Sequence, residues 1–136
     1  MIEFNYETEF NVSNEDKVKH WISGCIKRYK FREGELNFIF CDDKYLLKLN
    51  QDFLEHDTLT DIISFDYTMG KLIGGDIFIS VERVKENAIL FNQTFDNELN
   101  RVIIHGILHF FGFKDKATED VVKMRTAEDE CLEYFK

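Results

Sequence analysis

Apolar residues recur along the chain with two different periods, which predict strands and helices in alternation. A period of two predicts strands at 2–6 and 35–40, and segments rich in isoleucine and phenylalanine predict two more at 61–67 and 72–80. The last two segments are separated by a turn around Gly70, so we expect them to form a hairpin.

Apolar spacings of three and four residues predict helices between and after these strands. Ser13 and Asp96 are candidate N-terminal caps, and Gly112 is well suited to end the helix that contains the histidines discussed below. Because helices and strands are intermixed around a hairpin, we expect an α+β fold with a small mixed β-sheet packed against about five helices. The predicted helices cover 13–29, 43–53, 81–91, 96–111 and 118–135.

The length and composition indicate one ordinary folded domain. A chain of 136 residues suffices for a single hydrophobic core, so we expect one domain over 1–136. Hydrophobic residues make up 44%, and no stretch approaches the roughly 20 apolar residues that a membrane helix requires. The N-terminal segment lacks a basic region followed by an apolar one, so no secretory signal is expected and a cytoplasmic location is predicted.

Cysteine spacing and charge limit the kinds of site and partner that the chain can have. Cys25, Cys41 and Cys131 lie far apart without a CxxC motif, so we expect reduced core cysteines. A net charge of −9 disfavours a polyanionic partner in general, yet basic residues gather in two short stretches and predict a local basic surface. These stretches contain Lys27, Arg28, Lys30 and Arg32, and then Lys114, Lys116, Lys123 and Arg125.

The segment IIHGILHFFGFKDK, residues 103–116, places two histidines in an otherwise apolar helix. Residues four apart on a helix are turned by about 40°, so His105 and His109 can direct their imidazoles at one point. A histidine pair alone is weak evidence for a metal, because histidines in apolar helices often satisfy only local hydrogen bonds. Asp115 follows the turn at Gly112 and supplies a third donor. Three protein ligands with a fourth open position are typical of catalytic zinc.

Other residues near this motif refine the expected chemistry. Gly106 stands where HExxH peptidases have their general base, so a metallopeptidase is disfavoured. His56, beside Asp57 in a polar loop, is a candidate for proton transfer, although a solvated loop residue fits it equally well, and a substrate phosphate oxygen is another candidate. Asp61 and Asp76 either stabilise local backbone or orient the zinc-binding imidazoles.

Four motifs together resemble the YbeY family, the single-strand-specific metallo-endoribonucleases of bacterial ribosomal RNA maturation. HGILHFFGFKD resembles the family motif HGxLHLxGYDH, LTDIISF at 59–65 resembles PTDVLSF, and GGDIFIS at 74–80 resembles LGDIxIS. Leu49 and Asn50 stand at the family's LN pair. Order and spacing agree across about 35–116.

The resemblance implies one zinc ion per chain, with His105 and His109 as its first two ligands. The family's third histidine corresponds to Asp115, whose carboxylate is also an acceptable zinc ligand. A shift of one residue would place Lys116 there instead, and a protonated lysine cannot bind the metal.

The arginine that follows the family's LN pair is missing. Phe53 and Leu54 stand where the family has Tyr-Arg, so any role of that arginine is absent or has moved. Lys48, Arg83 and Arg101 are candidate substitutes.

The function implied by the resemblance is a metal-dependent single-strand-specific endoribonuclease in ribosomal RNA (16S 3′ end) maturation and ribosome quality control. Water activated at the zinc site of His105, His109 and Asp115 would hydrolyse phosphodiester bonds. Implied partners are single-stranded ribosomal RNA and ribosomal small-subunit proteins, with no membrane. The alternative is a ribosome-associated RNA-binding assembly factor with a structural or lost metal site. RNA contacts are expected at Lys27, Arg28, Lys30, Arg32, Lys114 and Lys116.

Overall fold

The computed structural model describes residues 1–54 and 59–135, and its elements follow the predicted order. The strands are β1 (Ile2–Tyr6), β2 (Arg32–Cys41), β3 (Ile62–Asp66) and β4 (Leu72–Ser80). The helices are α1 (Glu15–Arg28), α2 (Asp43–Leu54), α3 (Val81–Leu90), α4 (Phe95–Phe110) and α5 (Thr118–Glu133). The strands form one sheet in the order β1-β2-β4-β3, in which only β3 runs antiparallel to its neighbour. The predicted α+β class with a mixed sheet is therefore confirmed.

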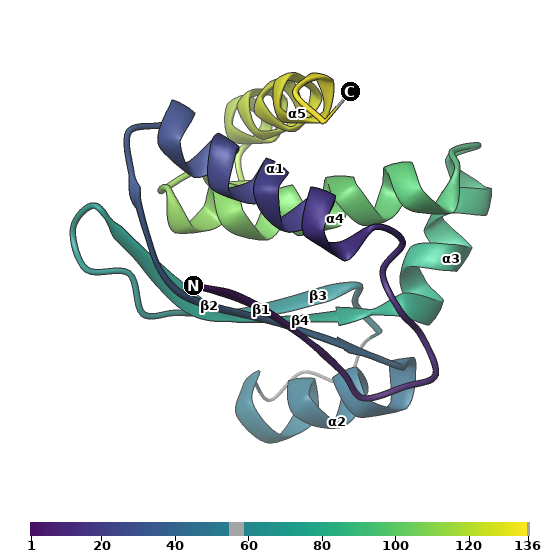
Figure 1. The fold of residues 1–136 in the computed structure, drawn as a ribbon. Helices are drawn as coiled ribbons and strands as arrows, with labels where there is room; N and C mark the ends of the chain where they lie inside the picture. Colours follow the sequence, from purple (N-terminus) through teal and green to yellow (C-terminus); the bar gives the residue numbers. More distant parts are fainter. Residues whose placement is uncertain (55–58, 136) are drawn as a thin grey trace.

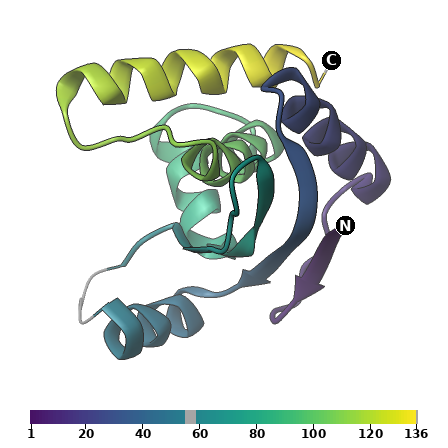
Figure 2. The same ribbon diagram turned by 90° about the vertical axis from the view of Figure 1, so that its left-hand side faces the viewer.

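Helices cover both faces of the sheet, as Figure 1 shows. α1 and α4 lie over one face, α5 lies above α4, and α2 lies alone beneath the other face (Figures 1 and 2). The larger core fills the space between the sheet, α1 and α4, whereas a small cluster of Cys41, Leu46 and Ile63 lies under α2. α4 is the central helix of this arrangement, because most of its residues are buried. It is also the helix that carries the histidine pair.

The two predicted helix caps are wrong. α1 has Asn14 rather than Ser13 as its N-cap, in the left-handed conformation with φ 56°, which asparagine tolerates better than most residues. α4 begins before Asp96, because the Thr94 hydroxyl accepts a hydrogen bond from the Asn97 N–H at 3.1 Å. Asp96 instead lies in the first turn, where the helix dipole favours a carboxylate.

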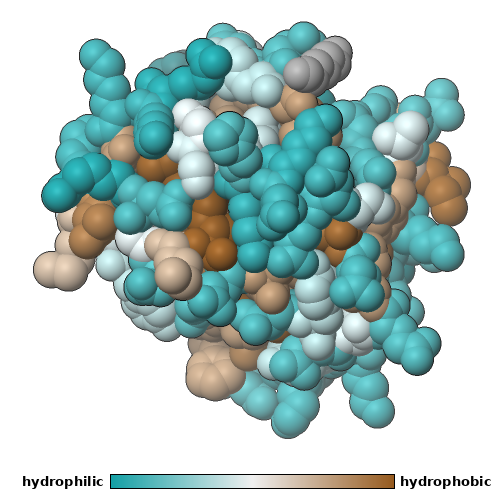
Figure 3. Space-filling model, viewed as in Figure 1, coloured by the Kyte–Doolittle hydropathy of each residue, from teal (hydrophilic) through white to brown (hydrophobic). Residues whose placement is uncertain are grey.

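The cysteines lie in the core, and the visible surface is mostly polar. All three cysteines are free and buried, as predicted. None of the helices in the described part of the chain is long and apolar enough to cross a bilayer. The face shown in Figure 3 is largely hydrophilic, with apolar side chains in small separate groups.

Gly106 marks a close approach of α4 to the sheet. A Cβ atom there would lie 3.0 Å from Ile62 Cδ1 and 3.1 Å from Ile77 Cδ1. Gly106→Val is therefore expected to lower the free energy of unfolding by about 1–3 kcal/mol, measured by urea denaturation. Gly24 is the matched control, because a Cβ atom at this site in α1 meets nothing within 4 Å. Gly24→Ala should stabilise the protein by up to about 1 kcal/mol, and equal destabilisation by both changes would contradict the packing explanation.

Candidate metal centre

The last turns of α4 and the segment after it bring together three side chains that can bind a metal. His105 and His109 project from one face of α4 and are half-buried. The helix ends before Gly112, whose φ of 103° redirects the chain so that Asp115 faces the histidines. Within the described residues, these three form the one group of three or more histidine, cysteine or acidic side chains that could hold a metal ion.

The spacing of the three ligand atoms matches a tetrahedral zinc site. The Nε2 atoms of His105 and His109 are 3.0 Å apart, and Asp115 Oδ2 lies 3.4 Å and 3.2 Å from them. Atoms bound to one zinc ion at about 2.0–2.2 Å in tetrahedral geometry are separated by about 3.3–3.6 Å. The three atoms therefore lie close to three corners of such a tetrahedron.

The other ring nitrogen of each histidine contacts an oxygen that fixes its protonation. His105 Nδ1 lies 2.6 Å from Glu128 Oε2, and His109 Nδ1 lies 3.0 Å from the Phe113 carbonyl oxygen. A carbonyl or an ionised carboxylate only accepts, so Nδ1 donates in both rings and Nε2 of each neutral ring keeps a lone pair. Two lone pairs and the Asp115 carboxylate then converge on one point. This donor set fits a divalent cation of the zinc type.

Glu128, on α5, links this site to a network of arginines. Its Oε1 accepts a hydrogen bond from Arg101 Nη1 at 2.9 Å, and Arg101 Nη2 also binds Asp129 at 2.7 Å. Burial opposes ionisation of Glu128, but the hydrogen bonds from His105 and Arg101 outweigh it, so its pKa lies below the ordinary value. Burial likewise lowers the pKa of His105, and the hydrogen bond and charge of Glu128 reverse this effect, so its pKa is raised.

Sequence reasoning did not identify Glu128. The available signal was an acid on the apolar face of α5, where Met124, Ala127 and Cys131 are also buried. The functional alternative for Asp61 and Asp76 is wrong, because Glu128 and the Phe113 carbonyl occupy the positions that orient the two imidazoles. Asp76 instead accepts a hydrogen bond from Asn37 Nδ2 at 3.1 Å, which joins β4 to β2.

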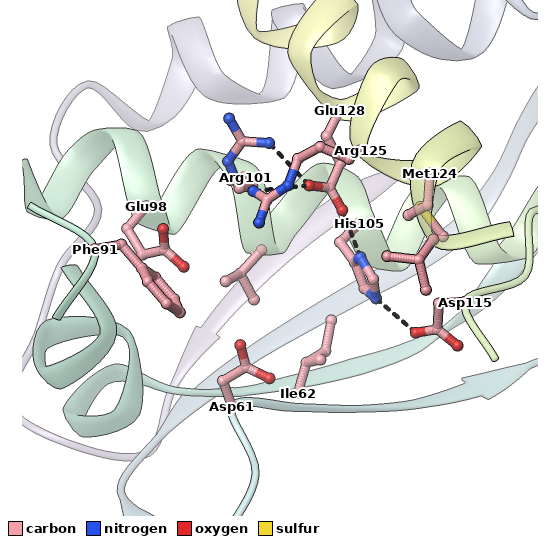
Figure 4. Close-up of a pocket in the computed structure, with 12 residues that line it drawn as sticks. Asp61, Ile62, Phe91, Glu98, Arg101, His105, Asp115, Met124, Arg125 and Glu128 are labelled. Atoms are coloured by element: carbon pink, nitrogen blue, oxygen red, sulfur yellow. Dashed lines mark hydrogen bonds and ion pairs between the residues drawn. The ribbon is translucent and has the colours of Figure 1, made fainter. Parts of the chain in front are cut away.

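A pocket of about 340 Å³ opens beside the metal ligands (Figure 4). His105 and Asp115 lie at one end of it, Glu98 and Phe91 lie at the other, and Asp61 lies between them. Burial raises the pKa of Asp61, and the neighbouring charge of His105 offsets this only in part. Two of the three candidate metal-binding side chains, His105 and Asp115, therefore border a cavity large enough for part of a substrate.

The predicted RNA-binding residues lie around one aromatic cluster. Tyr29 and Phe31 stack on Phe111 with ring centroids 5.0 Å and 4.6 Å apart. These contacts bring the turn between α1 and β2 next to the segment that leads from α4 to Asp115. Lys114 and Lys116 lie on that segment and share a hollow with His109 and Asp115. The basic cluster at this turn consists of Lys27 and Arg28 at the end of α1, Lys30 on the turn and Arg32 at the start of β2, all exposed.

The candidates for the missing family arginine differ in position. Lys48 and Arg83 pair with aspartates and do not line the pocket beside the metal ligands, whereas Arg101 does line it. Arg125 is a second arginine in this pocket, and its side chain is 60% exposed. The proposed proton-transfer residue His56 lies outside the described residues.

Comparisons with known proteins identify the family of the chain. The family model described as Endoribonuclease YbeY matches residues 2–136. The Endoribonuclease YbeY of Flavobacterium johnsoniae is 57% identical over 135 residues, covering 99% of this chain and 97% of the relative. That of Flavobacterium psychrophilum is 54% identical, covering 99% and 96%. The solution structure of TM1509 from Thermotoga maritima superposes with a TM-score of 0.71 at 28% identity, covering 99% of this chain and 89% of that one. The chain therefore belongs to the endoribonuclease YbeY family.

Proposed function

We propose that this protein is a zinc-dependent endoribonuclease that cleaves single-stranded ribosomal RNA, including the 16S 3′ end, in ribosome maturation and quality control. The observation that carries the proposal is the convergence of His105 Nε2, His109 Nε2 and Asp115 Oδ2 within 3.0–3.4 Å of one another beside an open pocket. Membership of the endoribonuclease YbeY family supports RNA as the substrate. Proposed partners are ribosomal small-subunit proteins, in the cytoplasm.

Each residue of the site has a separate role in the proposed hydrolysis. His105, His109 and Asp115 would hold the ion, and Glu128 keeps the proton of His105 on Nδ1 so that Nε2 remains available. Zinc, when bound, would supply a Lewis acid that polarises a phosphoryl oxygen and activates water at neutral pH. The pocket positions the substrate strand beside these ligands.

Arg125 is the cation best placed to bind a substrate phosphate. Arg101 is engaged by Glu128 and Asp129 through two short ion pairs. The contact of Arg125 with Glu128 is longer, at 3.7 Å, so its exposed guanidinium is available to a phosphate. It offers the positive charge that the family arginine position, Leu54 here, no longer carries.

The activity is tested by removing and returning the metal. Zinc-loaded protein should cleave a labelled single-stranded RNA, lose that activity on brief chelation and regain it with zinc, while a duplex of the same sequence stays intact. His109→Ala, purified in parallel, controls for contaminating nuclease. Cleavage that survives both chelation and His109→Ala would contradict the proposal.

The alternative function is a ribosome-associated RNA-binding factor, and the replacement of the family arginine by Leu54 favours it. The same experiment separates the two functions. RNA binding that persists in the chelated protein, with no cleavage after zinc is returned, would establish the binding factor.

Charge reversal of Arg28 and Lys30 is expected to weaken RNA binding and to reduce its salt dependence. Each lost phosphate contact lowers the slope of log affinity against log salt by about 0.7 for single strands, so the double variant should lose about 1.4. Fluorescence anisotropy at several salt concentrations measures both effects. Lys44→Glu is the control, because this exposed lysine lies on α2, beneath the opposite face of the sheet. Equal salt slopes in the wild type and the double variant would remove this basic cluster from the RNA path.

A further inference from the structure

Glu98 is a buried acid that faces the pocket and has no hydrogen-bonding partner among the described residues. The residue is only 5% exposed, and its carboxylate points into the pocket from the first turns of α4 (Figure 4). Within residues 1–54 and 59–135, no side chain or backbone group forms a hydrogen bond or ion pair with this carboxylate. Burial raises its pKa, because the charged form is poorly solvated there. A ligand that donates N–H groups to Glu98 would give its carboxylate hydrogen bonds that no described residue supplies.

Phe91 lies at the same end of the pocket. It follows the last residue of α3, is 54% exposed, and its side chain extends toward Glu98 and Asp61 in Figure 4. An accessible aromatic face provides a surface on which a planar base can stack. An aromatic face beside hydrogen-bond acceptors is the combination with which proteins recognise an unpaired nucleobase.

A second metal ion is a poorer occupant of this end of the pocket. Glu98 and Asp61 do not join a third metal-binding side chain in the described part of the chain. Glu98 also lies at the end of the pocket opposite His105 and Asp115 (Figure 4). A planar organic ligand with N–H donors therefore suits the site better than a cation does.

Among the four bases, guanine matches a carboxylate best. Its Watson–Crick edge carries two adjacent donors, N1–H and the N2 amino group, which the two oxygens of one carboxylate can accept together. Adenine and cytosine present one amino group beside an acceptor nitrogen, and that nitrogen would face the second oxygen unfavourably. Uracil presents one donor between two acceptors.

We propose that Phe91 and Glu98 form a guanine-selective subsite for the nucleotide next to the cleaved phosphodiester. Phe91 stacks on the base, and Glu98 accepts hydrogen bonds from N1–H and the N2 amino group. The phosphate of the same nucleotide then extends along the pocket toward Arg125 and the metal ligands. The assignment to a substrate nucleotide rests on the proposed function, whereas guanine binding itself does not.

The test is mononucleotide binding to the zinc-loaded full chain. Isothermal titration with GMP, IMP and AMP should show that GMP binds at least about fivefold more tightly than IMP or AMP. This factor follows because a bidentate pair of hydrogen bonds discriminates between bases by about 1–3 kcal/mol. Glu98→Gln should abolish this selectivity, and Phe91→Leu should weaken all three nucleotides together. Glu119→Gln, at an exposed acid outside the pocket lining, and Leu90→Ala, at the exposed residue before Phe91, are the controls and should change neither the selectivity nor the affinities.

Nucleotide binding tests the guanine subsite, and RNA cleavage tests the proposed function, so the two can fail independently. Equal affinities for GMP and AMP in the wild type, or selectivity retained in Glu98→Gln, would overturn the subsite, even if RNA is cleaved. Selective GMP binding that Glu98→Gln abolishes would support the subsite, even in a protein that fails to cleave RNA. A circular dichroism melt of each variant shows that folding is intact.

Discussion

Asp115→Ala is expected to remove both bound zinc and RNA cleavage. The carboxylate is the third donor of the cluster, with Oδ2 3.2 Å from His109 Nε2 and 3.4 Å from His105 Nε2. Two imidazoles alone leave the ion with too few protein ligands for a stable catalytic site. Metal analysis after brief chelation and zinc return should find about one ion per wild-type chain and little in the variant. Cleavage of single-stranded RNA should fall to the background of the chelated wild type.

Two further variants make this result specific. Asp115→His restores a family-type ligand and is expected to keep zinc, because imidazole nitrogen binds it well. Glu119→Ala removes an exposed acid of α5 outside the cluster and should change nothing. Normal zinc content in Asp115→Ala would show that Lys116 or a residue elsewhere supplies the third ligand.

Glu128→Gln is expected to weaken zinc binding by about 10–100-fold, the range observed when groups that orient metal ligands are removed. The amide cannot satisfy both His105 and Arg101 as the carboxylate does, because it has a single acceptor oxygen in place of two. His105 then loses the acceptor that keeps its proton on Nδ1. Competition against a chelator of known affinity measures the change in the dissociation constant.

Asp129→Asn is the matched control for this change. Asp129 also binds Arg101, at 2.7 Å, but makes no contact with either histidine in the described structure. If Glu128 acts by orienting His105, zinc affinity falls in Glu128→Gln and not in Asp129→Asn, whatever both changes do to the melting temperature. Equal zinc affinities in the two variants would mean that Glu128 only supports the packing of α5.

Hydrophobic periodicity was sufficient to predict the order of helices and strands. Buried positions such as Val18, Trp21, Ile22 and Cys25 of α1 recur every three or four residues, and this spacing can be read directly from the sequence. Helix starts depend instead on local competition for hydrogen bonds. Thr94, Asp96, Ser13 and Asn14 are all acceptable caps, and the backbone around each one decides which is used.

The grouping of the three candidate metal-binding side chains was predictable for a similar reason, whereas the residues that support them were not. His105 and His109 are four residues apart and therefore share a helix face, and Asp115 follows His109 by six residues, beyond the end of α4. Glu128 is 23 residues from His105 in sequence, and their contact depends on how α5 packs against α4. The pocket end with Phe91 and Glu98 likewise combines the end of one helix with the start of the next. Such contacts depend on how the helices pack against one another, and the spacing of apolar residues in the sequence does not show this.

The contact between His105 and Glu128 also gives the metal centre influence over the last helix of the fold. The later part of α5 is fastened independently, because Trp21 Nε1 donates a buried hydrogen bond to the Cys131 carbonyl at 2.7 Å. Glu128 lies one turn before Cys131, in the later half of α5, so a ligand that fixes His105 also restrains this part of the helix. Loading with metal would thus slow local opening around Glu128 more than at the start of α5. Metal binding would therefore reduce the mobility of the surface of α5 that also carries Arg125.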